Sequence, residues 1–251
     1  LPIVITGDAD LMEKTTETLD EDFTSSGATS HTVNNTTVGG WLTSDYTECK
    51  VNGTNDNMDF GLPSDATNNA ITYDLTTALS DTAWVLRGKF NFTALDSQPQ
   101  SNFWWGMSSI DSTGTSATAR DFIGMQTSNS SGTKTFGVQE KDAGTLYGEA
   151  EQDSQVLTWA TGVDYYFEIR RLSATKMDCR LYSDSAYSIL VSASSGTVPS
   201  TVTTLRYICL SNDARGGMAG DWNGTIDDIK LWDGITNPVN QEVATSSSDF
   251  L

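Results

Sequence analysis

The sequence predicts an all-β protein, an antiparallel jelly-roll β-sandwich. Short segments that alternate apolar and polar residues recur from residue 83 onward, and stretches rich in Gly, Ser, Asn and Asp separate them. A period of two residues is that of a strand buried on one face. Many short strands joined by such turns are typical of an antiparallel sandwich and not of a parallel α/β sheet.

The alternation is clearest in residues 83–92. Trp84, Leu86 and Phe90 share one face there, which predicts their burial, and Arg87 lies on the other face. The same pattern predicts further strands in residues 102–110, 121–128, 134–141, 163–172, 176–183, 204–211 and 224–232.

We predict a single sandwich domain over residues 23–234, because no linker or change in composition interrupts it. Residues 1–22 are interpreted as an N-terminal extension with the first strand, and residues 235–251 as a polar C-terminal tail. The apolar start, LPIVITG, could pair with a sheet edge of this chain or of a neighbouring copy. A first residue, Leu1, other than methionine suggests that an upstream segment has been removed.

The charge of the chain limits its partners. It has 14 Lys and Arg residues against 33 Asp and Glu residues, a formal net charge of −19. Nucleic-acid affinity depends on clustered Lys and Arg, so a nucleic-acid partner is not expected. The sequence has no apolar run of about 18 residues, so we expect no membrane span.

The glycosylation sequons and the cysteines concern where the protein is located. We expect an extracellular or cell-surface protein, the surface of a virion included. Cys49, Cys179 and Cys209 form no C-x-x-C motif, so either one disulfide, Cys179–Cys209, or buried free thiols are expected. Candidate glycosylation sites in Asn-X-Ser/Thr sequons are Asn34, Asn35, Asn52, Asn91, Asn129 and Asn223.

Several segments together resemble a known superfamily. They are LDEDF (19–23), GGW (39–41), FWWGMSS (103–109) and, most specifically, GTIDDIKLWDG (224–234). In this order they resemble the concanavalin A-like lectin/glucanase superfamily, in its LamG-like branch. The resemblance implies two stacked, curved antiparallel sheets with the first and last strands side by side. Its members include lectins, carbohydrate-binding modules, adhesins, glycoside hydrolases and polysaccharide lyases, so the fold leaves the function open.

No catalytic residues are predicted. A retaining glycosidase of this fold needs paired carboxylates about 5 Å apart, on an E-x-D-x-x-E strand, and that spacing is absent. Glu149 and Glu151 alternate on one face but lack an aromatic frame. His31 lies in a Ser-, Thr- and Asn-rich stretch, which predicts a solvent-exposed loop histidine.

The last strand predicts a metal site. Asp227 shares the register of Ile229, an inward-facing residue, and a carboxylate on the core side is costly unless it is paired or bound to a cation. In similar jelly-roll modules such a carboxylate meets acids of the first strand around a structural Ca²⁺. We therefore predict calcium bound by Asp20, Asp22 and Asp227, the alternative being that Asp227 only accepts backbone hydrogen bonds.

Exposed aromatic side chains are candidate sugar platforms. Trp84 and Trp105 fall on core registers, and Trp104 opposes Trp105 by alternation. Other aromatic residues flank turns. We predict that Trp104, Tyr147, Trp159 and Trp222 bind ligand.

The outward charges Arg87 and Arg170 are added to this ligand-binding set. With Lys89 and Glu168 they either bind an acidic polysaccharide or form a solvated face with ion pairs.

These observations predict a non-catalytic, lectin-like or adhesion domain that binds a glycan or polysaccharide. The alternative is a structural subunit of a filament, surface layer or virion, which binds copies of itself through its termini. A glycoside hydrolase or polysaccharide lyase ranks third.

Overall fold

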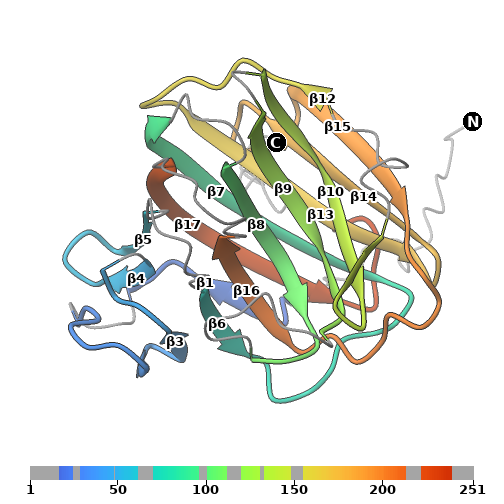
Figure 1. Cartoon of the computed structure of the whole chain (residues 1–251), viewed down its shortest axis with the longest axis horizontal. Coiled ribbons are helices and arrows are strands. Elements are labelled where there is room, and N and C mark those ends of the chain that lie inside the picture. The colour runs from blue at the N-terminus through green and yellow to red at the C-terminus, as the bar shows by residue number, and fades with distance from the viewer. Residues whose placement is uncertain are drawn as a thin grey trace, which may run out of the picture.

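The computed structural model confirms two antiparallel sheets (Figure 1). It describes residues 17–24, 29–47, 49–61, 70–95, 101–111, 120–130, 133–147, 155–212 and 222–238. All the elements assigned in these residues are strands. None of the described residues forms a helix long and apolar enough to cross a bilayer.

Sheet A contains the long strands of the middle and the end of the chain. Its order is β15 (Leu190–Thr197), β14 (Lys176–Tyr182), β13 (Asp164–Ser173), β7 (Trp84–Leu95), β17 (Trp222–Asp233), β5 (Asn57–Phe60) and β4 (Cys49–Asn52), with β1 (Leu19–Glu21) also paired to β17.

Sheet B stacks on sheet A. Its order is β11 (Thr145–Tyr147), β10 (Thr133–Asp142), β9 (Phe122–Ser130), β8 (Ser101–Ser108), β16 (Tyr207–Asn212), β6 (Ala70–Asp74), β3 (Trp41–Thr43) and β2 (Thr36–Val38), with β12 (Gln155–Val156) also paired to β10.

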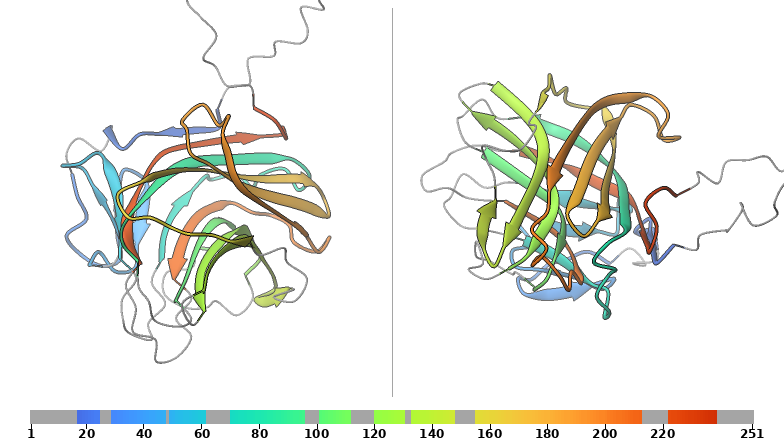
Figure 2. Two further views of the ribbon diagram at one scale, coloured as in Figure 1. Left: turned by 90° about the horizontal axis from the view of Figure 1, so that it is seen from above. Right: turned by 90° about the vertical axis from the view of Figure 1, so that its right-hand side faces the viewer.

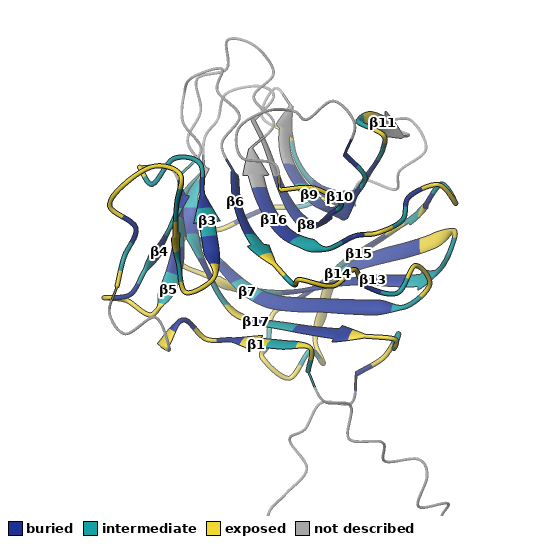
Figure 3. Cartoon of the chain, turned by 90° about the horizontal axis from the view of Figure 1, so that it is seen from below, coloured by how far each residue is buried: buried dark blue, intermediate teal, exposed yellow. Residues whose placement is uncertain are grey.

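The two sheets curve in the same direction and are nested (Figures 2 and 3). We call the outer face of sheet B the concave face and the outer face of sheet A the convex face. The core lies between the sheets. Trp84 and Leu86 from sheet A and Trp105 from sheet B are fully buried in it, as the alternation predicts. Trp105 packs edge-on against Phe167 across the core, with ring centroids 5.8 Å apart.

The first and last strands lie side by side, as the resemblance implies. In the β1–β17 pair Leu19 lies opposite Leu231, and the backbone N–H of Thr18 donates to the carbonyl of Leu231 at 2.7 Å. On its other side β17 pairs along its length with β7. The last strand is therefore held between two segments that are distant in sequence.

The three cysteines are buried thiols and are not joined in a disulfide. Cys179 belongs to the core between the sheets, whereas Cys209 belongs to a separate cluster on the concave face. Their side chains therefore lie on opposite sides of sheet B, so the Cys179–Cys209 disulfide is wrong and the alternative of buried thiols holds.

His31 is buried, so its expected exposure is wrong: only 2% of its surface is accessible. Its Nδ1 accepts from the backbone N–H of Val51 at 3.0 Å, which leaves the proton on Nε2. Nε2 donates to the carbonyls of Trp41, at 2.9 Å, and Thr36, at 3.1 Å. The imidazole thus joins the β2–β3 hairpin to β4, and the Ser- and Thr-rich sequence around it gives no sign of this.

His31 should make the stability of the fold depend on pH. Burial lowers the pKa of this imidazole below 6.5. The unfolded chain then binds more protons near and below about pH 6.5, so the free energy of unfolding should fall as the pH drops through that range. A His31→Asn variant keeps an acceptor but does not titrate. Its stability should change less between about pH 7 and pH 5 in urea unfolding, and equal slopes would contradict the assignment.

Candidate functional site

The concave face is built from every second residue of five neighbouring strands. Cross-strand register aligns these residues in rows, because inward and outward side chains alternate. The first row is Asp74, Tyr207, Ser108, Phe122 and Lys141, the second is Thr72, Cys209, Gly106, Gly124 and Gln139, and the third includes Ala70, Trp104, Gln126 and Gly137.

Two opposed glycines form the floor of this face. Gly106 pairs with Gly124 in the middle row. A Cβ atom at Gly124 would lie 2.3 Å from the carbonyl oxygen of Trp105 and 2.6 Å from Cζ of Phe122, closer than atoms can approach. The missing side chain at Gly124 leaves room for the Phe122 ring, whose centroid is 5.7 Å from that of Trp104.

Two cations lie over the Trp104 indole. The Lys141 ammonium is 4.2 Å from the ring centroid, and the Arg120 guanidinium is 5.7 Å from it. Arg120 also lies 5.4 Å from the Phe122 ring and donates to the Cys209 sulfur at 3.8 Å. A cation over an indole gains up to about 2 kcal/mol when it is desolvated. Exposure is 0% for Trp104, 2% for Arg120 and 3% for Lys141, so these contacts are dehydrated.

The Trp104 indole nitrogen is buried and has no hydrogen-bond partner among the residues that the structure describes. The indole nitrogens of Trp84 and Trp105 share this property, but they belong to the core between the sheets. On the concave face, the unpartnered N–H lies beside two cations. The Trp104 N–H is therefore a buried donor that lies next to two cations.

Carboxylates are scarce among the described positions of the concave face. Asp74, at the end of the first row, is bound by Arg206 through two contacts of 2.6 Å. Beside the second row, Asp111 accepts from the Thr72 hydroxyl at 2.9 Å. The second and third rows hold no acid at the positions given above. Glu149 and Glu151 lie outside the described residues.

The predicted ligand-binding aromatics are not brought together. Trp104 is on the outer side of sheet B, as alternation predicts, but it is buried and not an exposed platform. Trp159 was expected at the surface and instead lies in the core, 5.4 Å from the Phe92 ring. The backbones of Tyr147 and Trp222 lie in β11 and β17, and their side chains lie outside the described residues. Arg120 and Lys141 are the residues that sequence reasoning missed, because no periodicity links them to Trp104.

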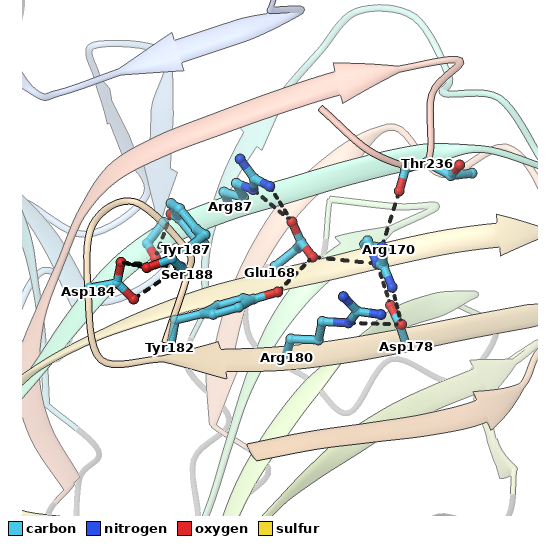
Figure 4. Close-up of polar contacts among 11 residues, drawn as sticks. Arg87, Glu168, Arg170, Asp178, Arg180, Tyr182, Asp184, Tyr187, Ser188 and Thr236 are labelled. Atoms are coloured by element: carbon cyan, nitrogen blue, oxygen red, sulfur yellow. Dashed lines mark hydrogen bonds and ion pairs between the residues drawn. The ribbon is translucent and has the colours of Figure 1, made fainter. Parts of the chain in front are cut away.

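The convex face holds the predicted Arg87 and Arg170 in an ionic network (Figure 4). Arg87 contacts Glu168 through Nη2 at 2.6 Å and Nε at 2.8 Å. Arg170 binds Asp178 with two nitrogens and lies 3.5 Å from Glu168. Arg87, Glu168 and Arg170 are 6%, 2% and 7% exposed. The structure therefore favours internal ion pairs over an open surface for an acidic polysaccharide.

Aromatic rings and a carbonyl complete this network. The Arg87 guanidinium lies 4.3 Å from the Tyr187 ring centroid and 5.5 Å from that of Trp232. Arg170 donates to the carbonyl of Thr236 at 3.4 Å, which ties the end of the described chain to β13. Burial alone would lower the pKa of Arg170, but the hydrogen bonds and charge of Asp178 outweigh it and raise that pKa.

Removing the central carboxylate should be strongly destabilising. We expect Glu168→Gln to lower the free energy of unfolding by about 3 kcal/mol or more, because two buried guanidiniums lose a charged partner. Lys230→Gln is the control. It breaks an exposed 3.7 Å pair with Asp20, and we expect a loss below about 1 kcal/mol. Urea unfolding measures both, and similar small losses would show that the network contributes little.

The predicted calcium ligands do not converge. A register shift in β17 after Asp227, with Asp228 at a φ of 52°, turns Asp227 outward, so its expected inward orientation is wrong. Asp227 contacts the Lys89 ammonium at 3.0 Å.

The first-strand acids are also occupied. Asp20 faces Lys230, and Asp22 binds the hydroxyl and N–H of its neighbour Thr24. The buried acid is Glu21, whose pKa is raised by burial. Within the described ranges no group of three or more His, Cys, Asp or Glu side chains could hold a metal ion. These carboxylates do not fit a calcium site as they are arranged, and structural calcium stays a prediction.

The candidate glycosylation sites differ in accessibility. Asn34 and Asn35 are exposed, whereas Asn52, Asn91 and Asn223 are partly buried. The Asn52 and Asn91 side-chain amides donate to Asp59 and Asp164, each at 2.7 Å. The side chain of Asn129 lies outside the described residues. Glycosylation therefore stays a prediction, with Asn34 and Asn35 best placed for it.

No family model and no curated protein matches the sequence. Solved structures do match the fold. The VIP36 exoplasmic/lumenal domain in its metal-free form is 12% identical, with a TM-score of 0.52 over 84% of this chain and 91% of that chain. A β-1,3-glucanase from Mycobacterium marinum is 12% identical, with a TM-score of 0.50 over 86% and 99%. A glycosyl hydrolase family 16 protein from Mycobacterium smegmatis is 11% identical, with a TM-score of 0.51 over 86% and 100%.

This likeness confirms the jelly-roll sandwich. The resemblance to the concanavalin A-like superfamily holds at the level of the fold. Membership of the superfamily, and of its LamG-like branch, stays a prediction.

Proposed function

We propose that this chain is a non-catalytic, lectin-like domain that binds a glycan on its concave face, outside the cell or at its surface. One observation carries the proposal: the Trp104 indole packs beside the Phe122 ring, two cations lie over it, and its N–H has no partner among the described residues. Sugars are bound by aromatic faces together with a few well-placed polar groups, and this cluster combines the two.

The concave site is closed in the conformation described, because Trp104, Arg120 and Lys141 are almost fully buried. A saccharide can reach them only when this face opens, so binding selects or induces a more open state. The observed association rate should therefore level off at high ligand concentration.

The absence of a catalytic role is supported by the chemistry of the same face. Hydrolysis with retention needs two carboxylates about 5 Å apart at the scissile bond. The described second and third rows supply amides, small residues and an indole at these positions instead. The carboxylate of Asp74 is held by Arg206 at the edge of the face.

A conservative change at Trp104 tests the site. Trp104→Phe keeps an aromatic ring and removes the N–H, so we expect about tenfold weaker binding of a glycan found by array screening. Trp232→Phe is the matched control, since Trp232 is on the convex face and should leave the affinity unchanged. Isothermal titration calorimetry measures the affinity of both variants. If Trp104→Phe binds the glycan as tightly as Trp232→Phe does, the binding site is not on the concave face.

A second candidate function, a self-assembling structural subunit, is favoured by one edge of sheet A. The first residues of strand β15 and the residue before it are apolar and exposed: Ile189, Leu190 and Val191 are 59%, 55% and 41% exposed. The later part of β15 packs against β10, where the Ser194 hydroxyl accepts from the Val138 N–H at 3.2 Å. The free part of this edge suits strand addition by the apolar LPIVITG segment (1–7) of a second copy.

If copies assemble through the β15 edge, a charge placed in that edge should prevent polymerisation. Leu190→Asp should abolish any polymer seen by size-exclusion chromatography and electron microscopy, because a charge would be buried in the joint. Removal of residues 1–10 should do the same. Val33→Asp, at a 57% exposed site in another part of the chain, is the control and should leave the polymer intact. A protein that stays monomeric at high concentration would exclude this function.

A further inference from the structure

We infer that Asn52 is a site of spontaneous covalent modification, at which the side-chain amide is converted through a cyclic imide into an aspartyl or isoaspartyl residue. Asn52 ends β4, and residues 53–56 form the turn to β5. The β4–β5 hairpin is the end of sheet A opposite β15 (Figure 1). The site is therefore separate from the concave face.

The reaction joins two neighbouring residues. The backbone nitrogen of Gly53 attacks Cγ of Asn52, a new N–Cγ bond closes the imide ring, and the Cγ–Nδ2 bond breaks. The proton of the Gly53 N–H leaves with Nδ2 as ammonia. Water then opens the imide at either carbonyl, so an amide and a water molecule become a carboxylate and an ammonium ion. Glycine favours ring closure because no Cβ atom crowds its nitrogen.

A hydrogen bond holds the Asn52 carbonyl in a reactive arrangement. Its Oδ1 accepts from the backbone N–H of Thr54 at 3.2 Å, which is the bond of an Asx turn. Because Asn52 and Thr54 flank Gly53, this bond folds the side chain back toward the Gly53 peptide and brings Cγ toward the attacking nitrogen. Negative charge develops on Oδ1 during the attack, and a donor already placed there lowers the barrier.

The leaving and attacking nitrogens have partners of their own. Nδ2 of Asn52 donates to Oδ2 of Asp59 at 2.7 Å. As the intermediate breaks down, Nδ2 changes from a neutral amide to an ammonium group, and a carboxylate stabilises that charge more than it stabilises the amide. The Gly53 N–H donates to the hydroxyl of Ser30 at 3.1 Å. The proton that has to leave thus faces a hydroxyl oxygen, which can accept it.

A second Asn-Gly pair, Asn223-Gly224, gives an internal comparison, since it too is followed by threonine. It lies inside β17, where Gly224 pairs with β5 on one side and with β7 on the other. A Cβ atom at Gly224 would lie 2.2 Å from a carbonyl oxygen of β7, so the strands enclose this backbone closely. Ring closure there requires the ladder to open, whereas Gly53 lies in a turn. We expect Asn52 to react and Asn223 to stay intact.

The product changes the hairpin permanently. It adds one negative charge to the formal −19 of the chain. A carboxylate at position 52 lies beside Asp59 in place of the amide donor, and like charges on paired strands repel each other. Since β5 pairs with β17, this repulsion loosens the end of sheet A in aged molecules.

The direct test follows both asparagines in the same molecules. The purified full chain, expressed without glycosylation, is kept folded at neutral pH in water enriched in heavy oxygen. It is then digested in mild acid and analysed by mass spectrometry. We expect the Asn52 peptide to exchange its amide nitrogen for solvent oxygen at least about tenfold faster than the Asn223 peptide. Equal rates in the folded protein, or an Asn52 that stays an amide, would overturn the inference.

Unfolding and variants show that the structure sets the rate. In concentrated urea the two asparagines should react at similar rates, because both are then Asn-Gly pairs in an open chain. Asp59→Asn keeps an acceptor for Nδ2 but has no charge, so conversion of Asn52 should slow about tenfold. Lys50→Gln is the matched control: it breaks the 3.8 Å contact with Asp59 but leaves the carboxylate, and conversion should not slow.

The sign of the Asp59→Asn effect separates assistance from protection. If the Asp59 hydrogen bond only restrained the amide, its loss would leave conversion unchanged or make it faster, and the assisting role of Asp59 would be wrong. Circular dichroism shows whether each variant is folded. The comparison of Asn52 with Asn223 in the wild-type chain stands even if one variant is not.

Discussion

The alternation of side chains in β8 is the constraint on which both faces of sheet B depend. One face of this sheet packs into the core, and the other carries the cluster around Trp104. Trp105 points inward and packs against Phe167, while Trp104 points outward and packs beside the tilted ring of Phe122. Alternation along the strand imposes this division. Any shift of β8 by one residue would exchange the two indoles and disrupt core and concave face together.

The concave cluster depends on the glycine pair below it. Since Gly124 has no side chain, the Phe122 ring can lie against the backbone there, and its centroid is 5.7 Å from that of Trp104. Arg120 and Lys141 then complete the cover above the indole. The same geometry also buries the indole N–H, so the proposed glycan binding requires this face to open.

On the convex face, buried charges are paired with one another. Burying Arg87 and Arg170 is costly, and carboxylates on neighbouring strands offset the loss of hydration. Two aromatic rings, Tyr187 and Trp232, shield the Arg87 guanidinium. This network joins β7, β13 and β14, and it holds both buried guanidiniums in ion pairs within the protein.

The sequence alone determined the fold class, the strands and the inward register of residues such as Trp84, Leu86 and Trp105, because a period of two is a local property of the chain. Only the tertiary structure decided what covers each outer face. His31, Trp159 and Trp104 are buried by segments distant in sequence, and the shift after Asp227 reverses one side chain without any signal in the alternation. Burial and pairing depend on which strands become neighbours, and no local pattern records that.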